Sequence, residues 1–257
     1  RRNRGSDMPS EVLDNPERSE NVQAAGPARH ARSLMLVRHG RTAYNLAGRI
    51  QGDIDIPLDD VGEWQVQQSA KALRELYVDR RPDARRLVVS SDLGRAMQTA
   101  RAFADPLRLE VHPDPRMRER NFGDWEGRSV DELSRDFPED YGLWTQLRGG
   151  ELRHGAEEKR HVGRRGVEGL RQWSEQAGPD TDLFVFAHGA WIAETVQTLL
   201  GLDAISSELT GLLSMRNAHW ARLIPLDQPD GSLIWRLMDY NHGPAIADTE
   251  QWEHPAL

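Results

Sequence analysis

The chain has 257 residues, of which 38% are hydrophobic and 29% are charged, so it is long enough to bury a substantial core and lacks the composition of a disordered protein. Its formal charge of −8 at pH 7 argues against a nucleic-acid-binding protein, because such proteins neutralise many phosphates with clustered cations. The absence of cysteine excludes disulfides, thiolate metal sites and cysteine nucleophiles.

The N-terminal segment differs from the rest of the chain. Residues 1–33 lack the apolar periodicity of a folded element, whereas Leu34 begins a clean apolar run. We therefore predict a polar extension over residues 1–33 and one catalytic domain over residues 34–257. No apolar run approaches the roughly 18 residues of a membrane helix, and the first residues lack the hydrophobic stretch of a secretory signal. These features predict a cytoplasmic protein that does not enter a membrane.

Three short apolar runs predict strands that are buried on both faces, and polar residues able to do chemistry follow each of them directly. The runs are Ser33–Val37, Arg86–Ser90 and Leu183–Ala187. Helix-like stretches lie between them, including Val61–Leu76 and Gly94–Ala104. This alternation predicts an α/β fold with a mostly parallel central sheet.

The later part of the chain is less regular. Residues 131–178 are expected to form helices that glycine-rich loops interrupt. Turn residues at 228–232 separate two alternating runs, Asn217–Ile224 and Leu233–Tyr240, and this pattern predicts a hairpin near the C-terminus.

Arg38-His39-Gly40 follows the first strand, at the carboxyl end, where open α/β sheets place their ligands. A neutral imidazole can attack phosphorus when its opposite nitrogen is held protonated. Gly40 would leave room for a phosphate next to the backbone, and Arg38 would hold its oxygens. A lone histidine at a strand end is more often an ordinary half-buried residue, so this motif needs support from elsewhere.

The other two strand ends supply that support. Arg95 follows the second strand in the first turn of a helix, whose N-terminus favours anions, and Asp92 stands where the helix N-cap would be. His188-Gly189 follows the third strand and repeats the strand-His-Gly arrangement. If these groups converge, two imidazoles and two guanidinium groups form a pocket for a phosphoryl group. Catalysis of phosphoryl transfer depends on positioning and on charge stabilisation.

With these residues the chain resembles the histidine phosphatase superfamily, which includes the cofactor-dependent phosphoglycerate mutases, over about residues 34–240. The resemblance rests on an ordered set of motifs: Arg38-His39-Gly40 with Thr42 and Asn45, Gln51-Gly52 with Asp55, Pro57 and Leu58, Ser91–Ala100, and His188-Gly189. It implies a three-layer α/β/α sandwich of the phosphoglycerate mutase-like type. It further implies catalytic roles for Arg38, His39, Arg95, Glu119 and His188, and substrate-binding roles for Thr42, Asn45, Gln51, Gly52 and Gly189.

The family also uses an acidic proton donor, for which Glu119 and Glu126 are the candidates. By resemblance this donor is Glu119, which would protonate the leaving alkoxide and later activate water. Glu126 is expected to be structural. Trp191 is expected in the core rather than in the pocket, since an aromatic residue on a helix against a sheet is usually buried. The remaining histidines show no metal-ligand spacing, so we predict no metal and no cofactor.

The sequence therefore predicts a metal-independent phosphomonoesterase that acts through a phosphohistidine at His39. Its predicted partner is a small phosphorylated metabolite of the sugar phosphate or phosphoglycerate type. The alternatives are a cofactor-dependent phosphoglycerate mutase and a non-catalytic domain that binds a phosphorylated ligand. Short matches also resemble actinobacterial members of the family that act on glucosyl-3-phosphoglycerate. Ala190 and Trp191 depart from that subgroup, so the substrate and the oligomeric state stay open.

Overall fold

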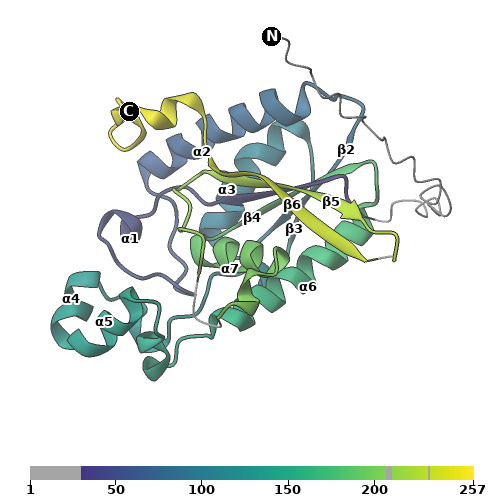
Figure 1. Ribbon diagram of the computed structural model, residues 1–257. Helices are drawn as coiled ribbons and strands as arrows, with labels where there is room; N and C mark the ends of the chain where they lie inside the picture. The colour runs from purple at the N-terminus through teal and green to yellow at the C-terminus, as the bar shows by residue number, and fades with distance from the viewer. Residues whose placement is uncertain (1–29, 207–209, 231) are drawn as a thin grey trace, which may run out of the picture.

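The computed structural model describes residues 30–206, 210–230 and 232–257 and has six strands and seven α-helices over these ranges (Figure 1). The strands are β1 (Ser33–Arg38), β2 (Arg85–Ser90), β3 (Val111–Pro113), β4 (Thr181–Ala187), β5 (Trp220–Asp227) and β6 (Leu233–His242). The helices are α1 (Ala43–Leu46), α2 (Asp60–Leu73), α3 (Gly94–Ala104), α4 (Val130–Asp136), α5 (Pro138–Thr145), α6 (Lys159–Ala177) and α7 (Gly189–Leu199). The predicted strands, helices and hairpin are all present, and α2 continues as a π-helical turn over Arg74–Val78.

The six strands form one sheet in the order β3-β2-β4-β1-β5-β6. Strands β1, β2, β3 and β4 are parallel, whereas β5 runs antiparallel to both β1 and β6. In the register of the parallel strands, Arg38 lies opposite Ala187, and Ser90 lies opposite Phe186. The residues that follow β1, β2 and β4 therefore meet at one edge of the sheet.

Helices cover both faces of the sheet: α2 and α3 lie on one side, and α6 and α7 lie on the other (Figure 1). The alternation of side chains along β1 explains this arrangement. Leu34 and Leu36 pack in the cluster that includes α6 and α7. Met35 and Val37 pack in the opposite cluster with α2 and with Phe103 of α3. These four of the six residues of β1 are at most 1% exposed, and the predicted three-layer α/β/α sandwich is confirmed.

Helices α4 and α5 form a small lobe that stands apart from the three layers (Figure 1). Its core is aromatic: the ring centre of Trp125 lies 5.6 Å from that of Trp144 and 6.4 Å from that of Phe137. A buried ion pair attaches the lobe to the body, with Arg120 Nη1 2.9 Å from Glu151 Oε1 and both side chains at most 2% exposed. The lobe therefore has a defined position against the segment that contains Arg120.

The folded body begins before Leu34. The Ala31 side chain is fully buried, and its N–H donates to the carbonyl and to the hydroxyl of Ser174 at 2.9 Å. Arg32 forms an ion pair with Asp182. Residues 31–33 are thus part of the fold, although we assigned them to the extension, and residues 1–29 of that extension lie outside the described residues.

The N-cap prediction for Asp92 was wrong. Leu93 is the N-cap of α3 and makes no side-chain bond there. Instead, Asp55 Oδ1 accepts the N–H of Gly94 at 2.8 Å across 39 residues of sequence, and Asp92 binds Arg118 through two bonds of 2.7 Å. A local pattern around Asp92 cannot show that a distant carboxylate reaches the same helix end.

Candidate active site

His39 follows β1 directly, and its residue surface is 1% exposed. Its Nδ1 lies 2.7 Å from the carbonyl oxygen of Gly40. Because a carbonyl can only accept, the ring carries its proton on Nδ1, and Nε2 keeps a lone pair. Burial, followed by the charges of Arg95 and Arg38, holds the pKa of His39 well below its usual value of 6.5. The ring is therefore neutral at pH 7.

Gly40 is required next to His39 because there is no room for a side chain. A Cβ at this position would lie 2.6 Å from the carbonyl oxygen of Gly62 and 2.6 Å from Val66 Cγ1. The N–H of Gly40 donates to Thr99 Oγ1 of α3 at 3.2 Å. Close contact with α2 and α3 thus sets the path of the backbone that presents His39.

Asn217 holds the same backbone from the other side. Its Nδ2 lies 3.2 Å from the carbonyl oxygen of His39, 3.3 Å from that of Gly40 and 3.1 Å from Asn45 Oδ1. Asn45 Oδ1 also accepts the N–H of Thr42 at 3.2 Å. These donors define which end of the Asn45 amide is oxygen, so its NH₂ group points away from them.

His188 follows β4 and is fully buried. Its ring centre lies 5.2 Å from that of His39, with an angle of 58° between the ring planes. Nε2 lies 2.8 Å from Ser91 Oγ at the end of β2, and Nδ1 has no partner among the described residues. Burial and then the charge of Arg95 hold the pKa of His188 well below 6.5. The structure thus brings both predicted histidines together in neutral form.

Arg38 and Arg95 bring two guanidinium groups to these histidines. Arg95 is fully buried and donates to the carbonyl oxygens of Ile54 and Gly52, both at 2.8 Å. Arg38 donates to the carbonyl of Met215. The Nε atom of each arginine is buried without a partner in the described part of the chain, and burial lowers the pKa of both. Buried cationic N–H groups of this kind favour an anionic ligand.

The carboxylate of Glu119 lies at the N-terminus of α7. Oε1 accepts the N–H groups of Trp191 and Arg120 at 2.8 Å, and Oε2 accepts that of Ala190 at 3.2 Å. Its charge is among those that raise the pKa of Arg38 and of Arg95 against the effect of burial. Glu119 therefore belongs to the same cluster as the two arginines and the two histidines.

Glu126 and Trp191 have the structural roles that we expected. Glu126 Oε1 accepts the N–H groups of Asp53 and Phe122 at 3.1 and 3.0 Å, which closes a loop. Trp191 is fully buried in the core, and its indole N–H donates to the carbonyl of Arg116 at 2.7 Å. The departure from the subgroup pattern at Trp191 therefore places a ring in the core.

Two of the predicted substrate-binding residues lie behind the pocket. Thr42 is fully buried and Gln51 is 8% exposed. Thr42 Oγ1 accepts the N–H of Asn45 at 3.2 Å and donates to Gln51 Oε1 at 2.8 Å. Thr42 and Asn45 form the capping box at the N-terminus of α1, and Gln51 is attached to it through Thr42, so in this geometry Thr42 and Gln51 support Asn45.

Gly52 and Gly189 each meet one of the arginines through the backbone. Gly52 has a φ of +55°, which favours glycine, and its carbonyl accepts the bond from Arg95. A Cβ on Gly189 would lie 3.2 Å from Arg38 Cζ and would collide with the hydroxyl of Ser214. Both glycines thus allow the close approach that the pocket requires.

The sequence analysis gave no site role to Ser91, Asn217 and Arg165. Their contacts join residues 97, 178 and 46 positions apart, so no local spacing could reveal them. Ser91 begins one of the stretches that resemble the family, which was the available signal for it, and Arg165 lies in the stretch for which only interrupted helices were predicted. Asn217 stands just before β5, where only the hairpin was predicted.

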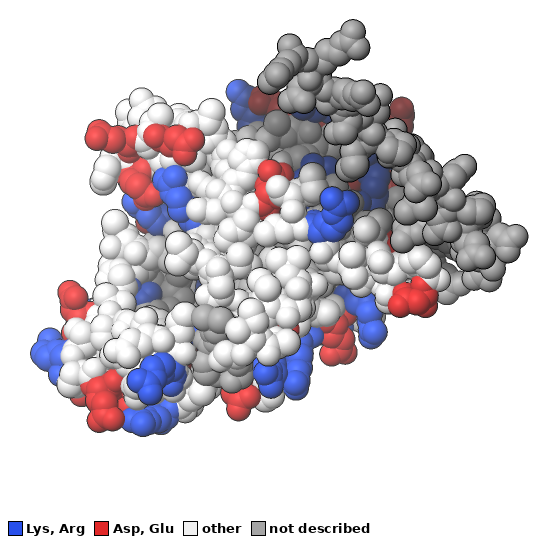
Figure 2. All heavy atoms as spheres, viewed as in Figure 1, with Lys and Arg blue, Asp and Glu red and all other residues white. Residues whose placement is uncertain are grey.

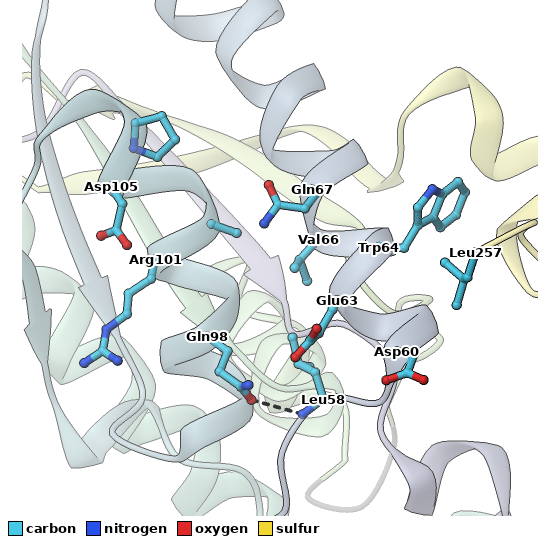
Figure 3. A pocket seen from close by; sticks show the side chains of 12 residues that line it. Leu58, Asp60, Glu63, Trp64, Val66, Gln67, Gln98, Arg101, Asp105 and Leu257 are labelled. Atoms are coloured by element: carbon cyan, nitrogen blue, oxygen red, sulfur yellow. Dashed lines mark hydrogen bonds between the residues drawn. The ribbon is translucent and has the colours of Figure 1, made fainter.

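The surface agrees with a site at this edge of the sheet. Figure 2 shows a hollow between the lobe of α4 and α5 and the upper part of the molecule, with Lys or Arg atoms visible inside it. A different pocket of about 640 Å³ lies between α2 and α3, where Trp64, Val66, Arg101 and Leu257 line it (Figure 3). None of the predicted site residues lines this second pocket.

Two kinds of feature are absent from residues 30–206, 210–230 and 232–257. In these ranges no three His, Asp or Glu side chains are grouped in a way that could hold a metal ion. No helix there is both long and apolar enough to cross a membrane.

Comparison with known proteins agrees with this geometry. The profile of the Histidine phosphatase superfamily (branch 1) matches residues 34–227. A glucosyl-3-phosphoglycerate phosphatase of Mycolicibacterium vanbaalenii is 33% identical over 235 residues, which cover 84% of this chain and 97% of the relative. A probable phosphoglycerate mutase of Yersinia pestis is 33% identical over 228 residues, which cover 87% of this chain and 96% of the relative.

Solved structures give the same result. The mycobacterial glucosyl-3-phosphoglycerate phosphatase in complex with VO3 has a TM-score of 0.69 and 30% identity, over 82% of this chain and 100% of that chain. A phosphoserine phosphatase of Entamoeba histolytica in complex with 3-phosphoglyceric acid has a TM-score of 0.64 and 27% identity, over 82% of this chain and 98% of that chain.

The chain therefore belongs to the histidine phosphatase superfamily, branch 1. Within it, the relatives and structural neighbours named as phosphatases favour a phosphoric monoester hydrolase over a mutase. The predicted family, the phosphoglycerate mutase-like fold and the class of enzyme are thus confirmed.

The buried neutral histidines predict that acid destabilises the folded protein. Burial lowers the pKa of His219 to about 4, and the pKa values of His39 and His188 also lie well below 6.5. Below pH 6.5 the unfolded chain binds protons that the folded chain does not bind, so the free energy of unfolding should fall as the pH is lowered. For His219 alone the loss should approach about 3 kcal/mol by pH 4, measured by urea unfolding.

A matched pair of variants isolates this effect. His219→Gln should reduce the pH dependence of unfolding between pH 6.5 and about 4, whereas His161→Gln, whose side chain is exposed, should leave it unchanged. Equal slopes for His219→Gln and the wild-type protein would contradict the assignment.

Proposed function

We propose that the protein hydrolyses the phosphate monoester of a small metabolite through a phosphohistidine at His39. The observation that supports this most is the arrangement of nitrogen atoms in one buried pocket. His39 offers a lone pair on Nε2, while His188 Nδ1 and the Nε atoms of Arg38 and Arg95 have no partner among the described residues. A phosphoryl group would satisfy these three N–H groups and present its phosphorus to the lone pair.

In the first step, His39 Nε2 attacks phosphorus and the bond from phosphorus to the ester oxygen breaks. The electron pair of that bond goes to the ester oxygen, which receives a proton from the carboxyl group of Glu119 and leaves as an alcohol. Arg38, Arg95 and His188 stabilise the charge on the three remaining phosphoryl oxygens. The ring of His39 then carries the phosphoryl group on Nε2 and a proton on Nδ1.

In the second step, a water molecule attacks the phosphorus of the phosphohistidine. Glu119, now a carboxylate, accepts a proton from that water. The bond from phosphorus to Nε2 breaks, its electron pair returns to Nε2, and inorganic phosphate leaves. The bond from His39 Nδ1–H to the Gly40 carbonyl can persist throughout, so the nucleophile keeps the same tautomer in both steps.

Ser91 supports the role of His188 in this scheme. Its Oγ accepts the N–H of Leu93 at 3.3 Å, and its own proton can then be donated to His188 Nε2. That donation places the ring proton of His188 on Nδ1, the nitrogen without a protein partner. A neutral imidazole thus becomes a hydrogen-bond donor to the phosphoryl group.

Replacement of His39 should abolish turnover. We expect His39→Ala to hydrolyse p-nitrophenyl phosphate roughly 1,000-fold more slowly or worse, and we expect no phosphoenzyme after rapid quenching. The measurement is phosphate release in buffer with EDTA, with the exposed His161→Ala as the control that keeps normal activity. Turnover by His39→Ala at the normal rate would rule out His39 as the nucleophile. A wild-type protein that is inactive on a broad panel of phosphate esters would favour a binding domain.

The proton donor should be visible in the leaving-group dependence. Glu119→Gln keeps an oxygen to accept the N–H groups at the start of α7 but cannot carry the proton. Hydrolysis of alkyl phosphates should fall by about 100-fold or more, and that of p-nitrophenyl phosphate much less, because nitrophenolate leaves without a proton. The exposed Glu175→Gln serves as the control, and equal losses on both ester classes would remove Glu119 from this role.

We propose a phosphoglycerate-type substrate, on the basis of the relatives and structural neighbours. Two of them are named as glucosyl-3-phosphoglycerate phosphatases, and a third was solved in complex with 3-phosphoglyceric acid. Of the two departures from the subgroup pattern, Ala190 and Trp191, the larger side chain, that of Trp191, lies in the core and does not narrow the pocket. A substrate of this kind also agrees with a cytoplasmic location and with the absence of any need for a nucleic-acid partner.

The mutase alternative is tested with the same substrates. Given 3-phosphoglycerate, with and without its bisphosphate, the enzyme should release inorganic phosphate faster than it forms 2-phosphoglycerate. Glucosyl-3-phosphoglycerate should be hydrolysed with a kcat/KM about tenfold or more above that for phosphoserine. Isomerisation faster than phosphate release would establish the mutase, and a preference for phosphoserine would overturn the phosphoglycerate assignment.

A further inference from the structure

Arg165 of α6 uses all five of its N–H donors. Two bonds go to the carboxylate of Glu157, from Nε at 2.9 Å and from Nη2 at 3.0 Å. Two go from Nη1 to the carbonyl oxygens of Arg116 and Arg118, both at 2.8 Å. The last goes from Nη2 to the carbonyl oxygen of Glu119 at 2.9 Å. A single planar group therefore holds three carbonyls of the segment that contains Glu119.

The segment needs such support because it has no regular structure of its own. Residues 118–122 belong to no helix or strand, so no ladder of backbone hydrogen bonds sets their position. Glu157 adds to the support, since its N–H donates to the carbonyl of Asn121 at 2.8 Å and its carbonyl accepts from Arg120 Nε at 2.7 Å. The ion pair between Arg165 and Glu157 thus forms a frame along residues 116–121.

We propose that Arg165 is a positioning residue for proton transfer, which places the Glu119 carboxyl group within reach of the leaving oxygen. This inference rests on the proposed role of Glu119. The Glu119 side chain is held from α7 through the N–H groups of Ala190 and Trp191, and its backbone is held from α6 by Arg165. The carboxyl group is therefore fixed from both ends, and a shift of the backbone by about 1 Å is enough to cost roughly 100-fold in rate.

A second effect of Arg165 has to be separated from the first. Its positive charge also contributes, after four larger causes, to the lowered pKa of His188. Lysine keeps that charge but cannot bind three carbonyls and a carboxylate with one planar group. Arg165→Lys therefore removes the frame and leaves the charge.

The experiment compares Arg165→Lys with the wild-type enzyme on an alkyl phosphate and on p-nitrophenyl phosphate. We expect kcat for the alkyl phosphate to fall by about 10- to 100-fold, KM to change by less than about threefold, and the loss on p-nitrophenyl phosphate to be only a few-fold. Vanadate inhibition, which reports on the phosphoryl pocket, should be retained. Arg164→Lys is the matched control, because Arg164 is the adjacent arginine and its side chain is exposed.

The outcomes separate this inference from the proposed function. If Glu119→Gln shows the leaving-group dependence and Arg165→Lys does not, Arg165 acts through its charge or not at all, and the positioning role is wrong. If Glu119→Gln shows no such dependence, the proton donor itself is wrong and the inference falls with it. Equal losses of Arg165→Lys on both substrates, with weakened vanadate inhibition, would indicate a general structural role and also overturn it.

Two further variants keep the test decisive. Glu119→Gln combined with Arg165→Lys should hydrolyse the alkyl phosphate no more slowly than Glu119→Gln alone, because both changes remove the same proton transfer. If Arg165→Lys does not fold, Glu157→Gln replaces it, since an amide can accept only one of the two bonds from Arg165. Glu157→Gln should show the same leaving-group dependence, and an unchanged profile would refute the positioning role.

Discussion

The partners of the two pocket arginines determine what the pocket can do. Arg95 is fully buried and Arg38 is half-buried, yet their hydrogen bonds run to the carbonyl oxygens of Met215, Ile54 and Gly52 rather than to carboxylates. Carbonyl dipoles orient a guanidinium group without cancelling its charge, so these bonds leave its positive charge available to a ligand. Burial, followed by the charges of these arginines, keeps both histidines neutral, and a neutral histidine is what nucleophilic attack requires. A chain with a net charge of −8 can therefore contain a site for a phosphoryl group.

Glu119, the acidic residue of the cluster, is positioned differently from the histidines and arginines. The histidines and arginines lie at or next to strand ends, whose positions the register of the sheet defines. Glu119 lies in an irregular segment, and its position depends on hydrogen bonds to two helices, α6 and α7. The position of Glu119, the proposed proton donor, thus depends on groups far away in sequence, whereas the positions of the two histidines depend on backbone pairing.

This difference explains how much the sequence could predict. Short apolar runs identified β1, β2 and β4 because strands buried on both faces have a local pattern, and parallel pairing then brings His39 and His188 to one edge. The cap of α3 was predicted wrongly, because Asp55 reaches Gly94 from 39 residues away. The roles of Ser91, Asn217 and Arg165 were missed for the same reason. The lobe of α4 and α5 was predicted only as interrupted helices, since its aromatic contacts depend on the packing of separate turns.

The relatives of this chain include both a phosphatase and a probable mutase, and the difference between the pocket and its surroundings can explain this. A phosphatase and a probable mutase are each 33% identical to this chain, and both reactions can begin with the transfer of a phosphoryl group to a histidine. They differ in the acceptor of the second step, which is water in one case and a bound hydroxyl group in the other. The proposed roles of Arg38, His39, Arg95 and His188 concern the phosphoryl group and not its acceptor. The outcome must therefore be decided by the residues that admit or exclude water around this pocket, and the irregular segment and lobe that adjoin it are where such differences can arise without disturbing the sheet.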